Sequence, residues 1–126
     1  MPVRGIGVDI CQVSRISESL ARFGERMEKR LFTPAELAYC RTFSDPMPHL
    51  AARFAAKEAA SKALGTGLAG GVGWTQIEVV QPGGRVPTIR FSGVALERFT
   101  AMGATSSHLS LSHDGGMAVA CVVVEG

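Results

Sequence analysis

The sequence contains few cysteines, few aromatics and no long apolar run, and each shortage excludes a class of protein. The longest uninterrupted apolar run, residues 117–124, is far shorter than the roughly 20 residues that a membrane-spanning helix needs. The N-terminal residues also lack the basic and apolar regions of a signal peptide. We therefore expect neither a membrane-spanning segment nor secretion.

Cysteine is limited to Cys11, Cys40 and Cys121, which form no CxxC pair and no metal-ligand spacing with histidine. An odd, unpatterned set of cysteines is typical of reduced thiols in a cytosolic protein. We therefore expect a cytoplasmic location.

Charge of one sign is also scarce, because the formal net charge is only +2. Such a small excess does not by itself indicate a nucleic-acid partner. A basic RNA-binding domain is an alternative, but it should present aromatic side chains on an open sheet. Tyr39, Trp74 and a few phenylalanines form no such pattern, so we expect no nucleic-acid partner.

The residues that are present are typical of one globular domain spanning residues 1–126. Apolar residues make up 46% of the chain, which at this length is enough for a buried core. Because large aromatic residues are few, we expect that core to consist mainly of valine, leucine, isoleucine and alanine.

A strand and an amphipathic helix are the first predicted elements. Residues 3–10 are mostly apolar and β-branched, which predicts a buried strand. A helix is predicted over residues 14–30, with Ser14 as its cap. Its apolar side chains recur at helical spacing and are expected to face the core: Ile16, Leu20, Phe23 and Met27.

Two further helices are predicted before residue 65. Thr33 and Glu36 have the spacing of a capping box, which indicates that a helix begins there. A third helix is predicted over residues 49–64, ending at Gly65, where a left-handed residue is favoured. Four alanines recur along one face of this helix and would let it pack close to a neighbour: Ala52, Ala56, Ala59 and Ala63.

The second half of the chain predicts two hairpins separated by a short helix. Residues 76–81 and 86–91 flank the turn sequence PGGR. Ser92 is expected to cap the short helix, and residues 108–125 form the second hairpin, whose last strand reads as buried on both faces. The whole order predicts an α+β fold, with a small, mostly antiparallel sheet packed with helices.

Asp9 is the first candidate site residue, because it lies near the end of an otherwise apolar strand. A buried carboxylate is costly unless it is paired or bound to a metal. Asp9 could cap a helix, pair with Arg4 or Arg15, or bind a metal ion. Gly5 and Gly7 favour the metal slightly, since glycines permit close backbone approach. The sequence GIG lacks the rest of a dinucleotide fingerprint, which excludes a Rossmann site.

Glu58 is the second candidate, in the stretch RFAAKEAASKALGTG at residues 53–67. Lys62 lies one turn later, in the orientation that favours a helix ion pair worth about 0.3–0.5 kcal/mol. Alternatively, a carboxylate among lysines suits a metal–phosphate ligand, because the acid holds the cation and the ammonium groups contact phosphate oxygens. His113 stands where a strand ends, as either a structural or a functional histidine.

Three stretches together resemble a known family. GIGVDI at residues 5–10, RFAAKEAASKALGTG at 53–67 and LSLSHD at 109–114 are similar in order and spacing to holo-acyl-carrier-protein synthase, the small type of 4′-phosphopantetheinyl transferase. That family transfers the phosphopantetheine arm of coenzyme A to a serine of apo-acyl carrier protein and releases 3′,5′-ADP. The resemblance implies both partners, with a carrier of fatty acid or polyketide synthesis.

The resemblance also implies roles for individual residues. Asp9 and Glu58 match the family's Mg²⁺ ligands, and together with Lys62 they form the expected catalytic set. Cys11 stands where longer relatives carry a third acid, so water is expected to complete the shell of the metal. Four side chains match positions around the phosphates of coenzyme A: Arg53, Lys57, Lys62 and His113.

The resemblance finally implies how the chain meets other proteins. The family docks its acidic carrier on the first helix, where Arg15, Arg22 and Arg26 share the outer face; ordinary solvation is the alternative. Longer relatives contain two such halves with a site between them, so this chain is expected to form a homotrimer with interfacial sites. The rival to an enzyme is a binding module for coenzyme A or a nucleotide, in which Mg²⁺ would be optional.

Overall fold

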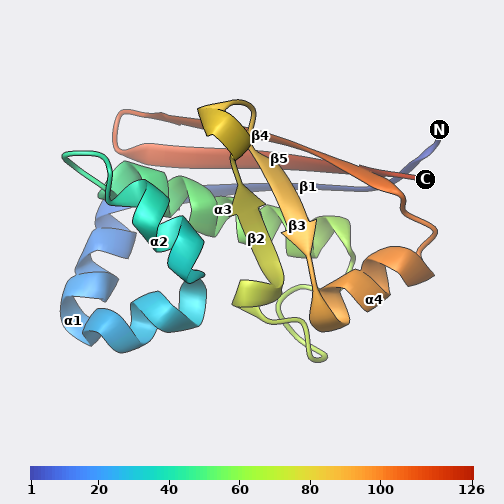
Figure 1. Ribbon diagram of the computed structural model, residues 1–126, viewed down its shortest axis with the longest axis horizontal. Coiled ribbons are helices and arrows are strands. Elements are labelled where there is room, and N and C mark those ends of the chain that lie inside the picture. Colours follow the sequence, from blue (N-terminus) through green and yellow to red (C-terminus); the bar gives the residue numbers. More distant parts are fainter.

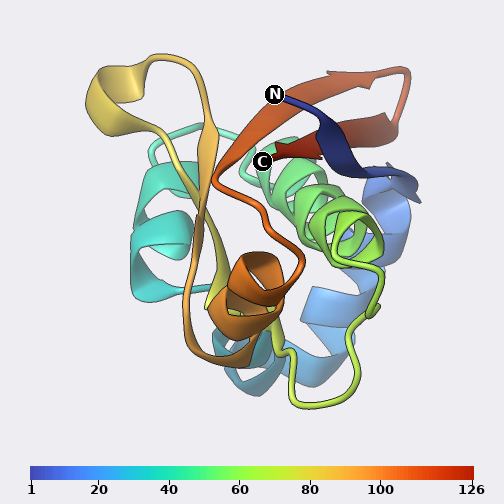
Figure 2. The ribbon, with the colours of Figure 1, turned by 90° about the vertical axis from the view of Figure 1, so that its right-hand side faces the viewer.

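Helix α3 (Met47–Ala63) runs through the middle of the molecule, with a three-stranded sheet on one side and the other elements around it (Figures 1 and 2). The structure, a computed structural model, describes residues 1–126. None of its helices combines the length and the apolar character needed to span a membrane.

The larger sheet has β5 (Met117–Glu125) in its centre, between β1 (Val3–Gln12) and β4 (Ser106–Asp114). Strands β2 (Ile77–Val80) and β3 (Thr88–Phe91) form a separate hairpin, and every pairing in both sheets is antiparallel. The predicted α+β fold and both hairpins are therefore confirmed, although the strands divide between two sheets.

The larger sheet lies very close to α3 where β1 carries glycines. A Cβ atom added at Gly7 would lie 1.8 Å from the carbonyl oxygen of Ala59, and one at Gly5 would lie 2.0 Å from that of Ala63. These glycines therefore make room for α3 and not for a bound ligand, which corrects the interpretation drawn from the sequence. The alanine face of α3 is confirmed, since all its members are buried: Ala52, Ala56, Ala59 and Ala63.

Only one face of the larger sheet is covered. Residues of β5 that point toward α3 are buried: Ala118, Ala120, Val122 and Val124. On the opposite face, Ile6, Val8 and Ile10 of β1 are 66%, 58% and 63% exposed. Two predictions are therefore wrong, because neither the first strand nor the last strand is buried on both faces.

Helix α1 (Val13–Leu31) confirms the predicted amphipathic helix but is interrupted at Gly24, whose φ is 66° and ψ is −149°. The helix begins after Gln12 without a side-chain cap, so the assignment of Ser14 as the cap was wrong. Phe23, expected to face the core, is 57% exposed. The backbone leaves the helix at Gly24, directly after Phe23, so the helical spacing does not continue from Phe23 to Met27.

Helix α2 (Pro34–Cys40) confirms the predicted capping box. The backbone N–H of Glu36 donates to Thr33 Oγ1 at 3.2 Å, and Glu36 Oε1 accepts from the backbone N–H of Thr33 at 2.9 Å. Helix α4 (Gly93–Ala101) follows Ser92 as predicted, although the Ser92 side chain makes no capping bond. Short 3₁₀ turns at Trp74–Gln76 and Pro82–Gly84 precede and follow β2.

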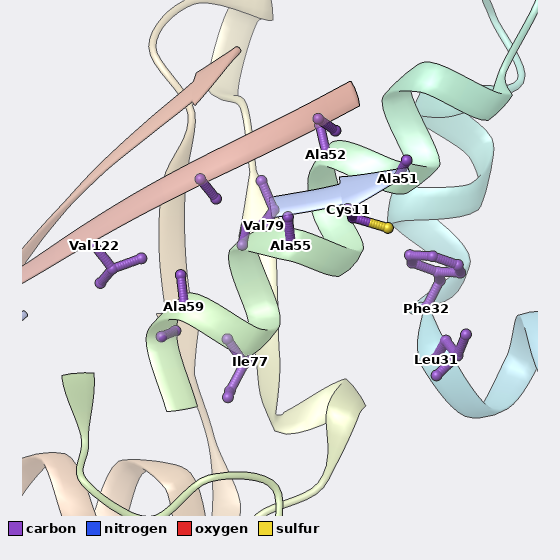
Figure 3. Packing of buried hydrophobic residues seen from close by; sticks show 14 of the residues in the cluster. Cys11, Leu31, Phe32, Ala51, Ala52, Ala55, Ala59, Ile77, Val79 and Val122 are labelled. Atoms are coloured by element: carbon purple, nitrogen blue, oxygen red, sulfur yellow. The ribbon is translucent and has the colours of Figure 1, made fainter. Parts of the chain in front are cut away.

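The core is mainly aliphatic and alanine-rich, as the sequence predicts. It lies between α3, the larger sheet and the β2–β3 hairpin, and Figure 3 shows Ile77 and Val79 of the hairpin near the alanines of α3. Only two phenylalanines, Phe32 and Phe91, are among its buried members.

Candidate active site

Asp9 and Glu58 approach each other from β1 and α3. Asp9 shares a face of β1 with Gly5 and Gly7, because alternate residues of a strand point the same way, and that face covers α3. Burial raises the pKa of Glu58 above its ordinary value, and the negative charge of Asp9 raises that pKa further. The close packing of β1 on α3 therefore brings two carboxylates into electrostatic contact.

Lys62 pairs with Asp9 and not with Glu58. Its ammonium lies 3.1 Å from Asp9 Oδ1 and donates to the Val8 carbonyl at 3.1 Å. The Glu58 carboxylate takes part in none of the ion pairs of the structure. The helix ion pair that the Glu58–Lys62 spacing favours is therefore absent, and Lys62 instead connects α3 to β1.

A cavity of about 760 Å³ opens beside Glu58. Its apolar wall includes Phe54 and Trp74, whose rings stack with centroids 4.9 Å apart. Helix α1 contributes three arginines and further apolar side chains to the lining: Arg15, Phe23, Arg26, Met27, Arg30 and Leu31. Arg22 is also exposed on α1, but it lies over the Phe23 ring, 5.2 Å from the centroid.

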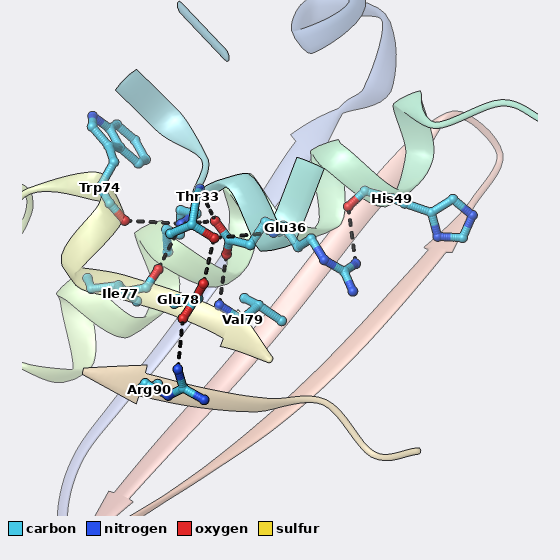
Figure 4. A network of polar contacts seen from close by, with 10 residues as sticks. Thr33, Glu36, His49, Trp74, Ile77, Glu78, Val79 and Arg90 are labelled. Carbon is cyan, nitrogen blue, oxygen red and sulfur yellow. Dashed lines mark hydrogen bonds and ion pairs between the residues drawn. The ribbon is translucent and has the colours of Figure 1, made fainter. Parts of the chain in front are cut away.

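Lys57 lies in the interior of the protein, which contradicts its predicted contact with phosphate. Its side chain is fully buried, with Nζ 2.7 Å from Glu36 Oε1. The ammonium also donates to the carbonyl oxygens of Trp74 at 3.1 Å and Ile77 at 2.8 Å, and Figure 4 shows these acceptors converging. Because all three N–H groups are used inside the chain, none is left for a ligand.

Arg53 is also nearly buried and lines a second cavity, of about 360 Å³. Its guanidinium lies 4.5 Å from the centroid of the Tyr39 ring and donates to Gln81 Oε1 at 3.0 Å. Its Nε atom has no hydrogen-bond partner. Arg53 therefore differs from Lys57, because part of its donor capacity stays free.

His113 lies near the end of β4, as predicted. Its side chain is exposed, and its ring centroid lies 5.3 Å from that of His49. Burial and the neighbouring His113 lower the pKa of His49, whose ring stacks on Phe43. In the sheet, His113 pairs with Ala118, which in turn pairs with Cys11 of β1. His113 is thus two strands away from β1, roughly 10 Å across the sheet.

The predicted site residues therefore form two groups. The first contains Asp9, Glu58 and Lys62, with Arg15 and Arg26 on the neighbouring cavity wall. The second contains His113 at the other edge of the sheet and Arg53 in the smaller cavity. The sequence reasoning missed Phe54 and Trp74 as the wall beside Glu58, although the only tryptophan of the chain was an available indication.

The comparison with known proteins identifies the family. A model of the 4′-phosphopantetheinyl transferase superfamily matches residues 5–122. The chain belongs to this superfamily. The resemblance inferred from three motifs is therefore confirmed.

Relatives of this phosphopantetheinyl transferase match it along nearly its whole length. It is 48% identical over 124 residues to a holo-[acyl-carrier-protein] synthase of Koribacter versatilis (strain Ellin345), covering 98% of each chain. It is 50% identical over 123 residues to one of Trichlorobacter lovleyi, again covering 98% of each.

Solved structures of the superfamily share the fold. The crystal structure of the holo-[acyl-carrier-protein] synthase from Neisseria meningitidis gives a TM-score of 0.90 at 33% identity, covering 99% of this chain and 100% of that one. The Helicobacter pylori synthase in complex with coenzyme A gives a TM-score of 0.84 at 33% identity, covering 95% and 99%.

In this phosphopantetheinyl transferase, Asp9 and Glu58 are suitable donors for a Mg²⁺ ion shared with a phosphate substrate. Carboxylate oxygens are hard ligands, and Mg²⁺ is usually held by one or two of them together with phosphate oxygens and water. No group of three or more histidine, cysteine, aspartate or glutamate side chains is arranged to enclose a metal. The donor set therefore fits a metal that needs its substrate to complete the shell.

Proposed function

We propose that this chain is a cytoplasmic holo-acyl-carrier-protein synthase, which moves the 4′-phosphopantetheine group of coenzyme A to a serine of apo-acyl carrier protein and releases 3′,5′-ADP. The observation that carries the proposal is its near full-length similarity to synthases of that name at 48% and 50% identity. The coenzyme A complex of the Helicobacter pylori relative supports the donor. Three free cysteines agree with a reducing compartment.

The transfer exchanges one phosphorus–oxygen bond for another. The serine oxygen of the carrier bonds to the phosphorus nearer the pantetheine, the bond to the adenosine-bearing phosphate breaks, and the serine proton passes to a base. Asp9 and Glu58 would hold Mg²⁺, which when bound neutralises negative charge on the pyrophosphate. The unpaired Glu58 carboxylate supports this role, because no internal cation has to be displaced from it.

Lys62 would contact the pyrophosphate from the same side. Its side chain is 52% exposed, and its ammonium is already held beside Asp9. A cation at that place would stabilise the charge that develops on the leaving phosphate. The exposed His113 and the place of Arg53 on the wall of the smaller cavity support further phosphate contacts by these two residues, whereas Lys57 is withdrawn from the set.

The outer face of α1 would dock the acidic carrier. Arg15, Arg22 and Arg26 are exposed there, and two of them line the cavity beside Glu58. Positive charge around an apolar cavity complements an acidic protein that must deliver its serine next to the metal. Such exposed charges act mainly on the association rate and its salt dependence.

The complete site would form between subunits of a homotrimer. The open face of the larger sheet, with exposed Ile6, Val8 and Ile10, is an apolar surface of the kind that subunits cover. The separation of His113 from Asp9 and Glu58 supports sites that combine one group from each of two subunits.

The proposal is tested by incubating the protein with coenzyme A, Mg²⁺ and a panel of apo-carriers and weighing each carrier. We expect a cognate carrier to gain the mass of phosphopantetheine, and no gain with any carrier would overturn the proposal. Asp9→Ala and Glu58→Ala are expected to reduce kcat by at least about a thousandfold while the assembly stays intact. Glu97→Ala, which removes an exposed carboxylate of α4, should keep the full rate.

A further inference from the structure

Lys57 and Glu36 form an ion pair in which both side chains are fully buried, and the pair connects three elements. Lys57 Nζ on α3 lies 2.7 Å from Glu36 Oε1 on α2 and donates to the Trp74 and Ile77 carbonyls. Glu36 Oε2 accepts the backbone N–H of Val79 at 2.8 Å. Helix α2, helix α3 and the segment leading into β2 therefore meet at one point (Figure 4).

Stability alone does not account for such a pair. Burial lowers the pKa of Lys57, and the Glu36 carboxylate only offsets that loss of solvation. Buried ion pairs often contribute no more to folding than apolar residues of similar volume, because desolvation cancels much of the attraction. What distinguishes this pair is its geometry, since two of the three Lys57 bonds end on the backbone of residues 74–77.

Trp74 is the residue of that segment that reaches the cavity. Its carbonyl accepts from Lys57, while its ring stacks on Phe54 and lines the cavity beside Glu58. The preceding residues, 65–73, include five glycines and form no helix or strand. Buried Val72 and the hydrogen bonds of the Gln76 side chain to Gly71 and Ala95 hold the neighbouring backbone. Trp74 itself is held by the stack of its ring on Phe54 and by the bonds that its carbonyl accepts from Lys57 and from the Ile77 N–H.

We propose that Lys57 is a positioning residue, which holds the backbone of residues 74–77 so that Trp74 stacks on Phe54 and completes the wall beside Glu58. This inference rests on the proposed function, in which the carrier docks over that cavity. Lys57 touches neither substrate and acts only through Trp74. Its loss should therefore weaken the use of the carrier and leave the use of coenzyme A nearly unchanged.

A double-mutant cycle between Lys57→Met and Trp74→Ala tests this route. Each single variant is expected to raise the KM for apo-carrier about tenfold, with the KM for coenzyme A within about twofold of the wild type. The combined variant should be no worse than Trp74→Ala alone, because Lys57 then has no ring to position. Additive effects on the carrier KM would overturn the proposal.

The sole tryptophan also reports directly on the structure. In Lys57→Met we expect the Trp74 emission to shift to longer wavelength and acrylamide quenching to increase, as the ring leaves its stack. Glu36→Gln is the matched control, since Lys57 keeps its N–H groups for both carbonyls. It should lower the melting temperature while leaving the emission and the carrier KM unchanged. A Lys57→Met protein that loses only thermal stability would show that the pair is merely structural.

Removal of Lys57 leaves the Glu36 carboxylate buried without its cation, which can prevent folding. In that case Lys57→Met combined with Glu36→Gln, which leaves no buried charge, is carried through the same measurements with the same expected outcomes. If the wild-type chain transfers nothing to any carrier, the proposed function fails, whereas the emission and quenching of Trp74 still test the positioning by Lys57.

Discussion

At the scale of single residues, the buried and half-buried carboxylates differ in whether a lysine of the same chain already neutralises their charge. Glu36 and Glu58 are both carboxylates close to lysines, but Glu36 accepts from Lys57, the Thr33 N–H and the Val79 N–H. Glu58 has no ion pair, and it lies beside another carboxylate, Asp9. A buried acid with its own cation supports the fold, whereas Glu58, which has no ion pair and lies near a second carboxylate, is suited to receive a cation.

This difference predicts that Glu58→Gln stabilises the metal-free protein at neutral pH. The pKa of Glu58 is raised in the folded chain, so its contribution to stability is complete below its unfolded pKa and is lost as the pH rises through the folded value. The variant does not ionise at this position, so its melting temperature should exceed that of the wild type at neutral pH, and the gap should close in acid.

Thermal unfolding in EDTA between about pH 4 and about pH 8 measures that gap. Glu97→Gln changes an exposed carboxylate of α4 and should show no gap at any pH. If the difference in melting temperature between Glu58→Gln and the wild type stays constant over this pH range, ionisation of Glu58 is not its cause.

The resemblance to a known family grouped Asp9, Glu58 and Lys62 into one predicted site, and the structure places Lys62 beside Asp9. It misassigned Lys57 for a physical reason. The partner Glu36 is 21 residues away along the chain, so no local spacing in the sequence predicts the ion pair. Burial of a lysine depends on tertiary contacts, and the pattern of one helix does not contain them.

Among the elements, local patterns were the most reliable guide. The Thr33–Glu36 capping box and the alanine face of α3 involve residues within a few positions of one another, and both are confirmed. The break at Gly24 was not predicted, because the apolar spacing of α1 continues in the sequence across a residue whose backbone leaves the helix. Coverage of the larger sheet also depends on long-range packing and could not be derived from β1 or β5 alone.

The contact between β1 and α3 predicts a strong effect of a single methyl group. Gly7→Ala would place Cβ 1.8 Å from the Ala59 carbonyl oxygen, so the strand and the helix must separate. We expect a loss of about 2–4 kcal/mol in the free energy of unfolding, measured by urea denaturation. In the variant that still folds at low temperature, the displaced strand should also reduce kcat, because Asp9 moves away from Glu58.

Gly73→Ala is the matched control for this substitution. Gly73 has a φ of −110°, and its nearest neighbour would be Gln76 Nε2 at 3.7 Å, an ordinary contact. This variant should unfold within about 0.5 kcal/mol of the wild type. If both variants lost the same free energy of unfolding, the close approach of β1 to α3 would not be the reason for the loss at Gly7.

At the scale of the whole molecule, one chain has an uncovered apolar sheet face, and its predicted site residues fall into two groups. The sheet register fixes the division, since β5 separates the strand of His113 from the strand of Asp9. One arrangement accounts for both features. Subunits that cover the apolar face of one another can also bring the first group of one chain to the second group of the next.

Such interfacial sites predict that two impaired variants restore each other. Asp9→Ala damages the first group and His113→Ala the second. In a cyclic trimer that contains both kinds of chain, about one site in three joins an intact first group to an intact second group. Co-expression with two different tags and purification on both isolates these mixed trimers. We expect them to transfer phosphopantetheine at about a third of the wild-type rate at low coenzyme A concentration. Mixed trimers of Asp9→Ala and Glu58→Ala, which damage the same group, should recover no transfer activity. If the mixed trimers of Asp9→Ala and His113→Ala also recovered none, each site would lie within one chain.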